Sequence, residues 1–93
     1  MFLWDPQKAI TNFEKHGVSF EEAALVFGDP DALDWDDHTH SHDEQRHKRL
    51  GVSTGGQVLL VVYTLRETKD GKEKIRIISA RQANRKERRA YAG

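Results

Sequence analysis

The run Val58–Leu65 constrains the fold most, because it is apolar on both faces of an extended chain. Its sequence, Val-Leu-Leu-Val-Val-Tyr-Thr-Leu, is rich in the β-branched and aromatic residues that favour strands. A strand that buries both faces lies inside a sheet that is covered on both sides. We therefore predict a central strand here, with the rest of the chain supplying its neighbours and its cover.

The flanking segments predict an antiparallel meander around this strand. Residues 46–53 have a strand pattern, and Gly55-Gly56 after them accepts the positive φ angles of a tight hairpin. Beyond the central strand, a turn at residues 69–72 leads into the β-branched strand 75–80. With a short strand at 31–35, the sequence predicts an antiparallel meander sheet of about four strands, and residues 2–4 are expected to add a short edge strand.

A first helix is predicted from Pro6 to His16. Asp5 is an N-cap acceptor, proline fits the first helical position, and Gly17 suits the left-handed residue that ends a helix. The residues expected to face inward are Ala9, Ile10 and Phe13. The residues expected to face outward are Lys8, Asn12 and Lys15.

Two capping patterns predict two further helices. Ser19 with Glu22 starts a helix that stops at Gly28, and Asn84 with Glu87 starts a short C-terminal helix. The predicted fold class is α+β, a single domain over residues 1–93. In it, two N-terminal helices and the short C-terminal helix pack with the antiparallel meander sheet.

The charges are balanced in number but separated along the chain. The net charge is zero, with 15 basic and 15 acidic residues. Residues 29–44 contain acids and no lysine or arginine, whereas residues 81–91 contain one acid, Glu87, among arginines and a lysine. A two-signed molecule of this kind suits a basic nucleic-acid site with an acidic patch elsewhere.

The composition also limits the class of protein. The chain has no cysteine, so it has neither a disulfide nor a thiolate metal site. No apolar run approaches the roughly 18–20 residues that cross a bilayer, and the start lacks a secretion-signal pattern. These features favour a cytoplasmic protein without a membrane partner.

The histidines His38, His40 and His42 form the strongest metal-ligand pattern in the chain. Alternate positions share one face of an extended strand, where imidazoles can bind zinc or nickel. Acidic loops that contain histidines are more often solvated surface segments. We therefore expect no metal or other cofactor, and a metal-dependent nuclease using these histidines remains an alternative.

Several motifs resemble those of the BrnT toxin family, over essentially the whole chain. The blocks Lys15-His-Gly-Val-Ser-Phe-Glu-Glu-Ala23 and Ile75-Arg-Ile-Ile-Ser-Ala-Arg81 are specific in combination. Further matches are Trp4-Asp-Pro6, Val26-Phe27, Asp29-Pro30, Gly51-Val-Ser53, Val61-Val-Tyr-Thr64 and the close Ala83–Tyr91.

The resemblance implies a RelE-like fold and a prokaryotic, cytoplasmic toxin of a type II toxin–antitoxin system. Members of this family are ribonucleases that inhibit translation. Each is neutralised by a BrnA antitoxin, which binds the toxin directly and attaches the complex to operator DNA. We expect metal-independent RNA cleavage through attack of a 2′-hydroxyl on the adjacent phosphate. A catalytically inactive module that binds RNA or antitoxin is the main alternative.

The chain departs from the family pattern in one segment. Where the family commonly has His-Ser-x-x-Glu-Glu-Arg followed by an aromatic residue, this chain has Gln45 for the second acid and His47 for the aromatic. The roles of Glu44 and His47 are therefore open.

Four residues are the candidates for catalysis. Arg81 is the first choice to bind the phosphate as its charge builds, and Arg88 is the second. The alternative for either arginine is a salt bridge to an acid such as Glu87. Tyr91 can donate a proton or stack on a base, and His16 can act as base or acid near neutral pH. Their alternatives are simple packing for Tyr91 and a favourable helix-end charge for His16.

A second set of residues is expected to contact RNA without taking part in the chemistry. Positions 8, 12 and 15 share one face of the first helix, although a solvated polar face is the common reading of such a strip. The expected RNA-binding residues are Lys8, Asn12, Lys15, Arg46 and Arg85.

Overall fold

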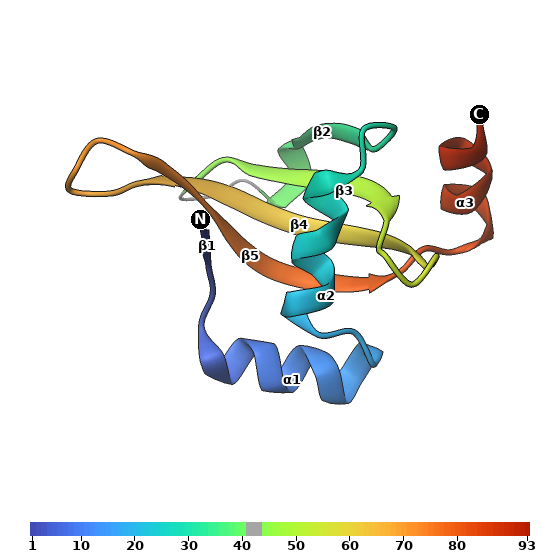
Figure 1. The fold of residues 1–93 in the computed structure, drawn as a ribbon, viewed down its shortest axis with the longest axis horizontal. Coiled ribbons are helices and arrows are strands. Elements are labelled where there is room, and N and C mark those ends of the chain that lie inside the picture. The colour runs from blue at the N-terminus through green and yellow to red at the C-terminus, as the bar shows by residue number, and fades with distance from the viewer. Residues whose placement is uncertain (41–43) are drawn as a thin grey trace.

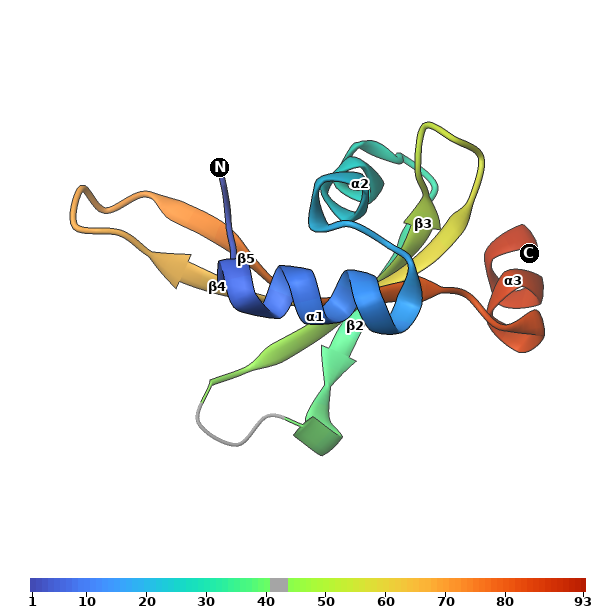
Figure 2. The same ribbon diagram turned by 90° about the horizontal axis from the view of Figure 1, so that it is seen from below.

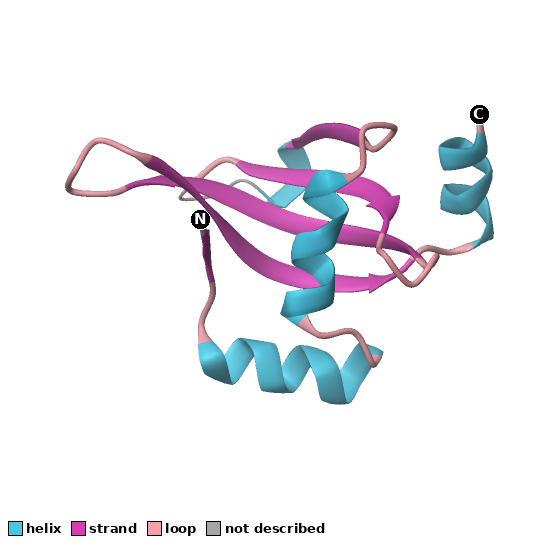
Figure 3. Cartoon of the chain, viewed as in Figure 1, coloured by secondary structure: helices cyan, strands magenta, loops and turns pink. Residues whose placement is uncertain are grey.

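The computed structural model describes residues 1–40 and 44–93. Figures 1 and 3 show a twisted sheet with helices at its face and edges. The strands are β1 (Phe2–Leu3), β2 (Leu33–Asp37), β3 (Arg46–Val52), β4 (Val58–Glu67) and β5 (Glu73–Gln82). The helices are α1 (Pro6–His16), α2 (Phe20–Leu25) and α3 (Arg85–Ala92), with short 3-10 turns at Val26–Gly28 and His38–His40.

The sheet has five strands in the order β1-β5-β4-β3-β2. Strands β2 to β5 form the expected antiparallel meander. The short edge strand expected at residues 2–4 is present as β1, a fifth strand that runs parallel to β5 and pairs Phe2 with Ile75, a direction that the sequence analysis did not predict. The direction of so short a strand depends on a partner some 70 residues away, and local patterns do not encode it.

The central strand β4 is where the sequence places it. Leu59, Leu60 and Val61 are at most 3% exposed. Leu59 and Val61 belong to the main core, which lies between the sheet and α2. Leu60 points the other way, into a smaller cluster with Leu50 and Ala83. Both faces of β4 are therefore buried, as the apolar run requires.

Helix α1 has the predicted ends but a different inward face. Asp5 accepts hydrogen bonds from the amides of Gln7 and Lys8, and Gly17 ends the helix at φ 70°. Ile10 and Phe13, which were expected inside, are 54% and 55% exposed. The helix runs along the β5 edge rather than over the sheet (Figure 2), so only a narrow stripe faces the core.

Asn12 occupies that stripe and completes the edge of β5. Its amide nitrogen donates to the carbonyl of Ala80 at 2.8 Å and to that of Val18 at 3.0 Å. Its amide oxygen accepts from the Ala80 N–H at 3.1 Å. Because β1 ends at Leu3, the β5 backbone needs another partner at this point, and the asparagine supplies it. The prediction that Asn12 faces outward was wrong.

The other two helices begin with the predicted caps. Ser19 accepts the Glu22 amide at 3.0 Å. In α3 both halves of the capping box are present: Asn84 accepts the Glu87 amide, and Glu87 accepts the Asn84 amide. In the part of the chain that the structure describes, no helix is long and apolar enough to cross a membrane.

Candidate functional site

The face of the sheet turned away from α2 is basic. Strand residues alternate between the two faces of a sheet, and Ile77 and Ala80 of β5 belong to the core beneath α2. Their neighbours Arg76 and Arg81 therefore point away from α2. On β3 the same face is marked by Leu50, which lies in the second cluster. We call this surface the basic face; its defining residues are Arg46, Lys48, Arg76 and Arg81.

A hollow of about 240 Å³ lies on the basic face, over the middle of β3, β4 and β5. Pairing across the sheet puts Lys48 opposite Val62, and Val62 opposite Ser79. Its lining combines apolar side chains with three cations and one carboxylate, so the net charge is positive, which suits a ligand with phosphate groups. The lining residues are Asp37, Arg46, Lys48, Leu60, Val62, Ile78, Ser79 and Arg81.

Arg81 is held at the end of this hollow by a two-point ion pair with Glu87. Its Nη1 and Nη2 donate to the two Glu87 carboxylate oxygens at 2.8 and 2.9 Å. The hydrogen bond from Arg81 lowers the pKa of Glu87, against the effect of burial, and nearby Lys48 lowers it further. The salt-bridge alternative for Arg81 is therefore present, and it fixes the guanidinium in the hollow.

The ion pair leaves one edge of the Arg81 guanidinium unused. Nη1 also donates to the Gln82 carbonyl at 3.2 Å. A guanidinium has five N–H groups, and three of them are now assigned. In the described part of the chain, Nε and the second N–H of Nη2 have no acceptor. These two donors lie side by side, in the geometry that binds two oxygens of one phosphate.

Arg88 and Tyr91 have other partners. Arg88 donates to the Ala83 carbonyl at 2.7 Å, and does not line the hollow. The Tyr91 hydroxyl donates to Asp29 Oδ2 at 2.6 Å, and this bond raises the pKa of Tyr91 to about 12. Its ring packs on the second cluster beside Leu50. The packing alternative for Tyr91 is therefore what the geometry favours, and the hydroxyl anchors α3 to the loop after α2.

His16, Lys8 and Lys15 line a second hollow of about 270 Å³, between α1 and β5. Ile78 and Ser79 line both this hollow and the one on the basic face. They sit at the irregularity of the β4–β5 pairing, where Ile78 has no Cα partner. The structure thus brings His16 and the helix lysines to one side of the β5 edge, with Arg81 on the other side.

Two of the expected RNA-binding residues, Asn12 and Arg85, do not present a free polar group to these hollows. Asn12 lines the second hollow, but its amide nitrogen and oxygen are used inside the protein and its side chain is buried. Arg85 is exposed at the first position of α3 and lines neither hollow. Arg46, in contrast, lines the basic hollow as a direct neighbour of Asp37 in the β2–β3 pairing.

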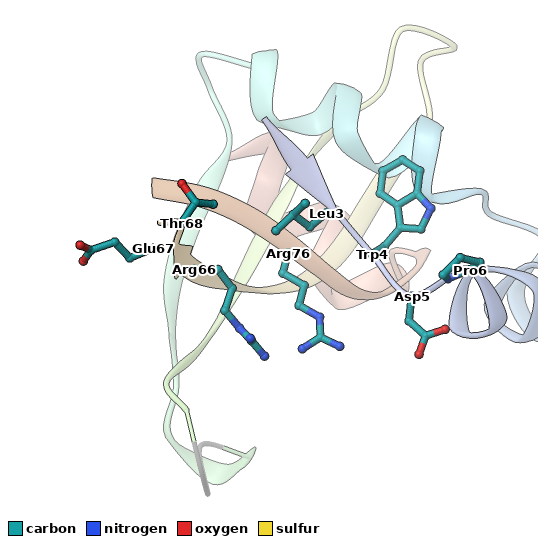
Figure 4. Close-up of a pocket in the computed structure, with 8 residues that line it drawn as sticks. All are labelled: Leu3, Trp4, Asp5, Pro6, Arg66, Glu67, Thr68 and Arg76. Atoms are coloured by element: carbon teal, nitrogen blue, oxygen red, sulfur yellow. The ribbon is translucent and has the colours of Figure 1, made fainter. Parts of the chain in front are cut away.

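Basic residues that sequence reasoning missed extend this surface. Figure 4 shows Arg66 and Arg76 pointing to the same side of the β4–β5 hairpin, where they line a further hollow of about 550 Å³. Arg66 pairs with Glu44 at 3.1 Å, which gives Glu44 a partner. Lys48, Arg76 and Arg66 lie at successive cross-strand positions of the basic face, so each of these positions carries a cation. The period-two alternation along the strands is the signal that identifies them.

The departures from the family pattern fall on the helix side and the β2–β3 connection. His47 stacks on Tyr63, with ring centroids 5.2 Å apart, and its Nδ1 lies 3.0 Å from Asp36.

The histidine pattern proposed for a metal does not have the expected backbone in its described part. His38–His40 forms a 3-10 turn, and not the extended strand that would put alternate histidines on one face. His42 lies outside the described residues, and those that are described contain no group of three side chains able to hold a metal ion.

Comparison with known proteins places this geometry in context. A family model described as the ribonuclease toxin BrnT of type II toxin–antitoxin systems matches residues 4–87. The fold is similar to the crystal structure of the ribonuclease toxin BrnT of Brucella abortus, with 24% sequence identity and a TM-score of 0.67. That alignment covers 91% of this chain and 99% of the other. No match was found among curated proteins.

Proposed function

Because the chain belongs to the BrnT family of ribonuclease toxins of type II toxin–antitoxin systems, we propose that it cleaves RNA on its basic face without a metal ion. The observation that carries this proposal is the free edge of Arg81. Glu87 holds the guanidinium from one end, and the Nε and Nη2 donors remain for a phosphate. An arginine fixed before the substrate arrives needs no reorganisation as charge develops on the phosphate.

The proposed reaction begins with loss of the proton from a ribose 2′-hydroxyl to a general base. The 2′-oxygen forms a bond to the adjacent phosphorus while the bond from phosphorus to the 5′-oxygen breaks. That oxygen takes a proton from a general acid, which leaves a cyclic 2′,3′-phosphate and a 5′-hydroxyl. Arg81 binds the phosphate oxygens, and each such donor supplies about 10²–10³ in rate.

We assign one of the two proton transfers, as general base or general acid, to His16, across the β5 edge from Arg81. It lines the hollow that adjoins the basic one through Ile78 and Ser79. An imidazole both accepts and donates protons near neutral pH, and a positioned acid or base adds about 10²–10⁴ in rate. Lys8 and Lys15, in the same hollow, would hold the phosphates that flank the cleaved bond.

In the cell, this activity would inhibit translation by destroying RNA in the cytoplasm. We further propose that a BrnA-like antitoxin neutralises the toxin and attaches the complex to operator DNA through its own DNA-binding domain. The family match supports a protein antitoxin as partner, since the family belongs to type II systems. The order of two helices before a meander sheet is compatible with the proposed RelE-like arrangement.

The test is cleavage of a single-stranded RNA by the purified protein, with and without EDTA. Arg81→Ala is compared with Arg89→Ala, which removes the same charge from an exposed position of α3. We expect Arg81→Ala to slow cleavage by about 10²–10³ and Arg89→Ala to leave it nearly unchanged. The products should carry cyclic phosphate ends.

Four results would contradict parts of this proposal. Loss of cleavage in EDTA would support a metal-dependent reaction. Growth arrest and RNA binding without cleavage would identify an inactive binding module of the same fold. Equal effects of the Arg81 and Arg89 variants would contradict the assignment of Arg81 to the site. A His16→Gln variant with full activity would contradict the assignment of His16.

A further inference from the structure

Trp35 lies on the basic face, although the sequence gives it no role beyond a short strand. Its neighbours in β2 point to the helix side: Asp34 accepts from the Tyr63 hydroxyl at 2.6 Å, and Asp36 pairs with His47. Because side chains alternate along a strand, the indole of Trp35 extends to the opposite side. Asp37, two positions on, lines the basic hollow and confirms this direction.

The indole stands directly beside a cation of the hollow. Trp35 is the Cα partner of Lys48 in the β2–β3 pairing, and side chains in such pairs touch or nearly touch. Lys48 lines the hollow, and its charge acts on Glu87, the partner of Arg81. Lys48 therefore connects Trp35, its partner in the strand pairing, with the hollow that Arg81 also lines.

The fold makes little use of this indole. Trp35 is 42% exposed, and it belongs to neither hydrophobic cluster among the described residues. Trp4, the second tryptophan of the chain, shows the contrast: it packs edge-on against Phe20 and adjoins the main core. A large, partly exposed aromatic side chain beside cations is typical of the sites where proteins stack unpaired bases.

We propose that Trp35 and Lys48 form a nucleotide-binding subsite at the β2 edge of the basic face. The indole stacks on one unpaired base of a single-stranded RNA, and Lys48 binds a neighbouring phosphate. Strands β3 and β4 separate β2 from β5, roughly 14 Å at the usual strand spacing of about 4.8 Å. The stacked base therefore lies within a few nucleotides of the phosphate at Arg81. This inference rests on the proposed function and adds a substrate class to it, single-stranded over double-stranded RNA.

The test uses the two tryptophans as separate reporters. The ligand is a short single-stranded RNA whose 2′-hydroxyls are methylated, so that the wild-type protein cannot cleave it by the proposed reaction. In Trp4→Phe only Trp35 emits, and we expect binding to quench its fluorescence. In Trp35→Phe only Trp4 emits, and we expect much weaker quenching, because Trp4 packs against Phe20 and adjoins the main core. Annealing the complementary strand should abolish the quenching in Trp4→Phe.

Affinity provides the second measurement. Trp35→Ala should weaken binding by about 5- to 100-fold, the range covered by stacking of one base on an aromatic side chain. Trp35→Phe keeps a ring and should retain most of the affinity. Because Trp35 is outside both hydrophobic clusters, both variants should melt near the wild-type temperature, which circular dichroism will check.

The outcomes separate this inference from the proposed function. Unchanged affinity in Trp35→Ala, or an emission of Trp35 in Trp4→Phe that RNA does not change, would overturn the subsite while Arg81-dependent cleavage could still be observed. Weaker binding to an antitoxin with unchanged RNA affinity would likewise overturn it, and would make the indole a protein contact. Stacking by a protein that cleaves no RNA would instead overturn the proposed function and leave the subsite.

Discussion

Glu87 has two contacts that a pair of substitutions can separate. Its carboxylate holds both terminal nitrogens of Arg81, and one of its oxygens also accepts the Asn84 N–H at 2.9 Å in the capping box. Glutamine serves at this capping position as glutamate does. Glu87→Gln therefore removes the charge and keeps the cap, whereas Glu87→Ala removes both.

The loss of stability from Glu87→Gln should be small. The side chains of Arg81 and Glu87 are 38% and 20% exposed, so solvent screens the pair. We expect the free energy of unfolding to fall by about 1 kcal/mol, near the upper end for exposed ion pairs. Glu87→Ala should lower the free energy of unfolding by about 0.5–1 kcal/mol more than Glu87→Gln does, because the helix cap is also lost. Urea unfolding at neutral pH measures both values.

The pH dependence should distinguish the charge from the cap. The Arg81 hydrogen bond lowers the pKa of Glu87 in the folded state from its ordinary value of 4.5. A carboxyl with a lowered folded pKa contributes stability that is complete above the unfolded value and lost as the pH falls through the folded one. The difference in the free energy of unfolding between the parent protein and Glu87→Gln should therefore become smaller as the pH falls below 4.5.

The effect on cleavage tests whether Glu87 positions Arg81. We expect Glu87→Gln to lower kcat about 10-fold with a smaller change in KM, because a less fixed arginine loses part of what one oxyanion donor supplies. Asn84→Ala is the matched control, since it weakens the cap and leaves the ion pair in place. An equal loss of kcat in Asn84→Ala, or none in Glu87→Gln, would refute the positioning role.

Two further predictions follow from buried hydrogen bonds. Tyr91→Phe should lower the urea concentration at the midpoint of unfolding, because Asp29 loses its shortest donor, and should leave the cleavage rate within about threefold of the parent value. A far larger loss of kcat in a folded variant would support Tyr91 as a proton donor. Asn12→Ala should lower the free energy of unfolding by about 2–4 kcal/mol, since the Ala80 N–H and two carbonyls lose their partner. A melting temperature within about one degree of the parent value would contradict the role of Asn12 in supporting the β5 edge.

Local sequence patterns were enough for the elements and their ends. The start of α1 at Pro6, the Ser19 cap and the box of Asn84 with Glu87 depend on residues a few positions apart, and the structure has each of them. The apolar run around Leu60 also required a central strand, because no other place in a sheet buries both faces. The family motifs could also be identified from the sequence alone, because each motif is a continuous block of residues.

The contacts that decide the candidate site join distant segments, and only the tertiary structure reveals them. Asn12 looked like a polar surface residue by helical period, but its bond to Ala80 spans 68 positions. Tyr91 donates a hydrogen bond to Asp29 across 62 positions, an anchoring contact that no local pattern indicates. Trp35 gained its place beside Lys48 from the pairing of two strands. The sequence determined which segments are strands and helices and which carry charge; sheet pairing determined which charges share a face, because that depends on partners that no local pattern specifies.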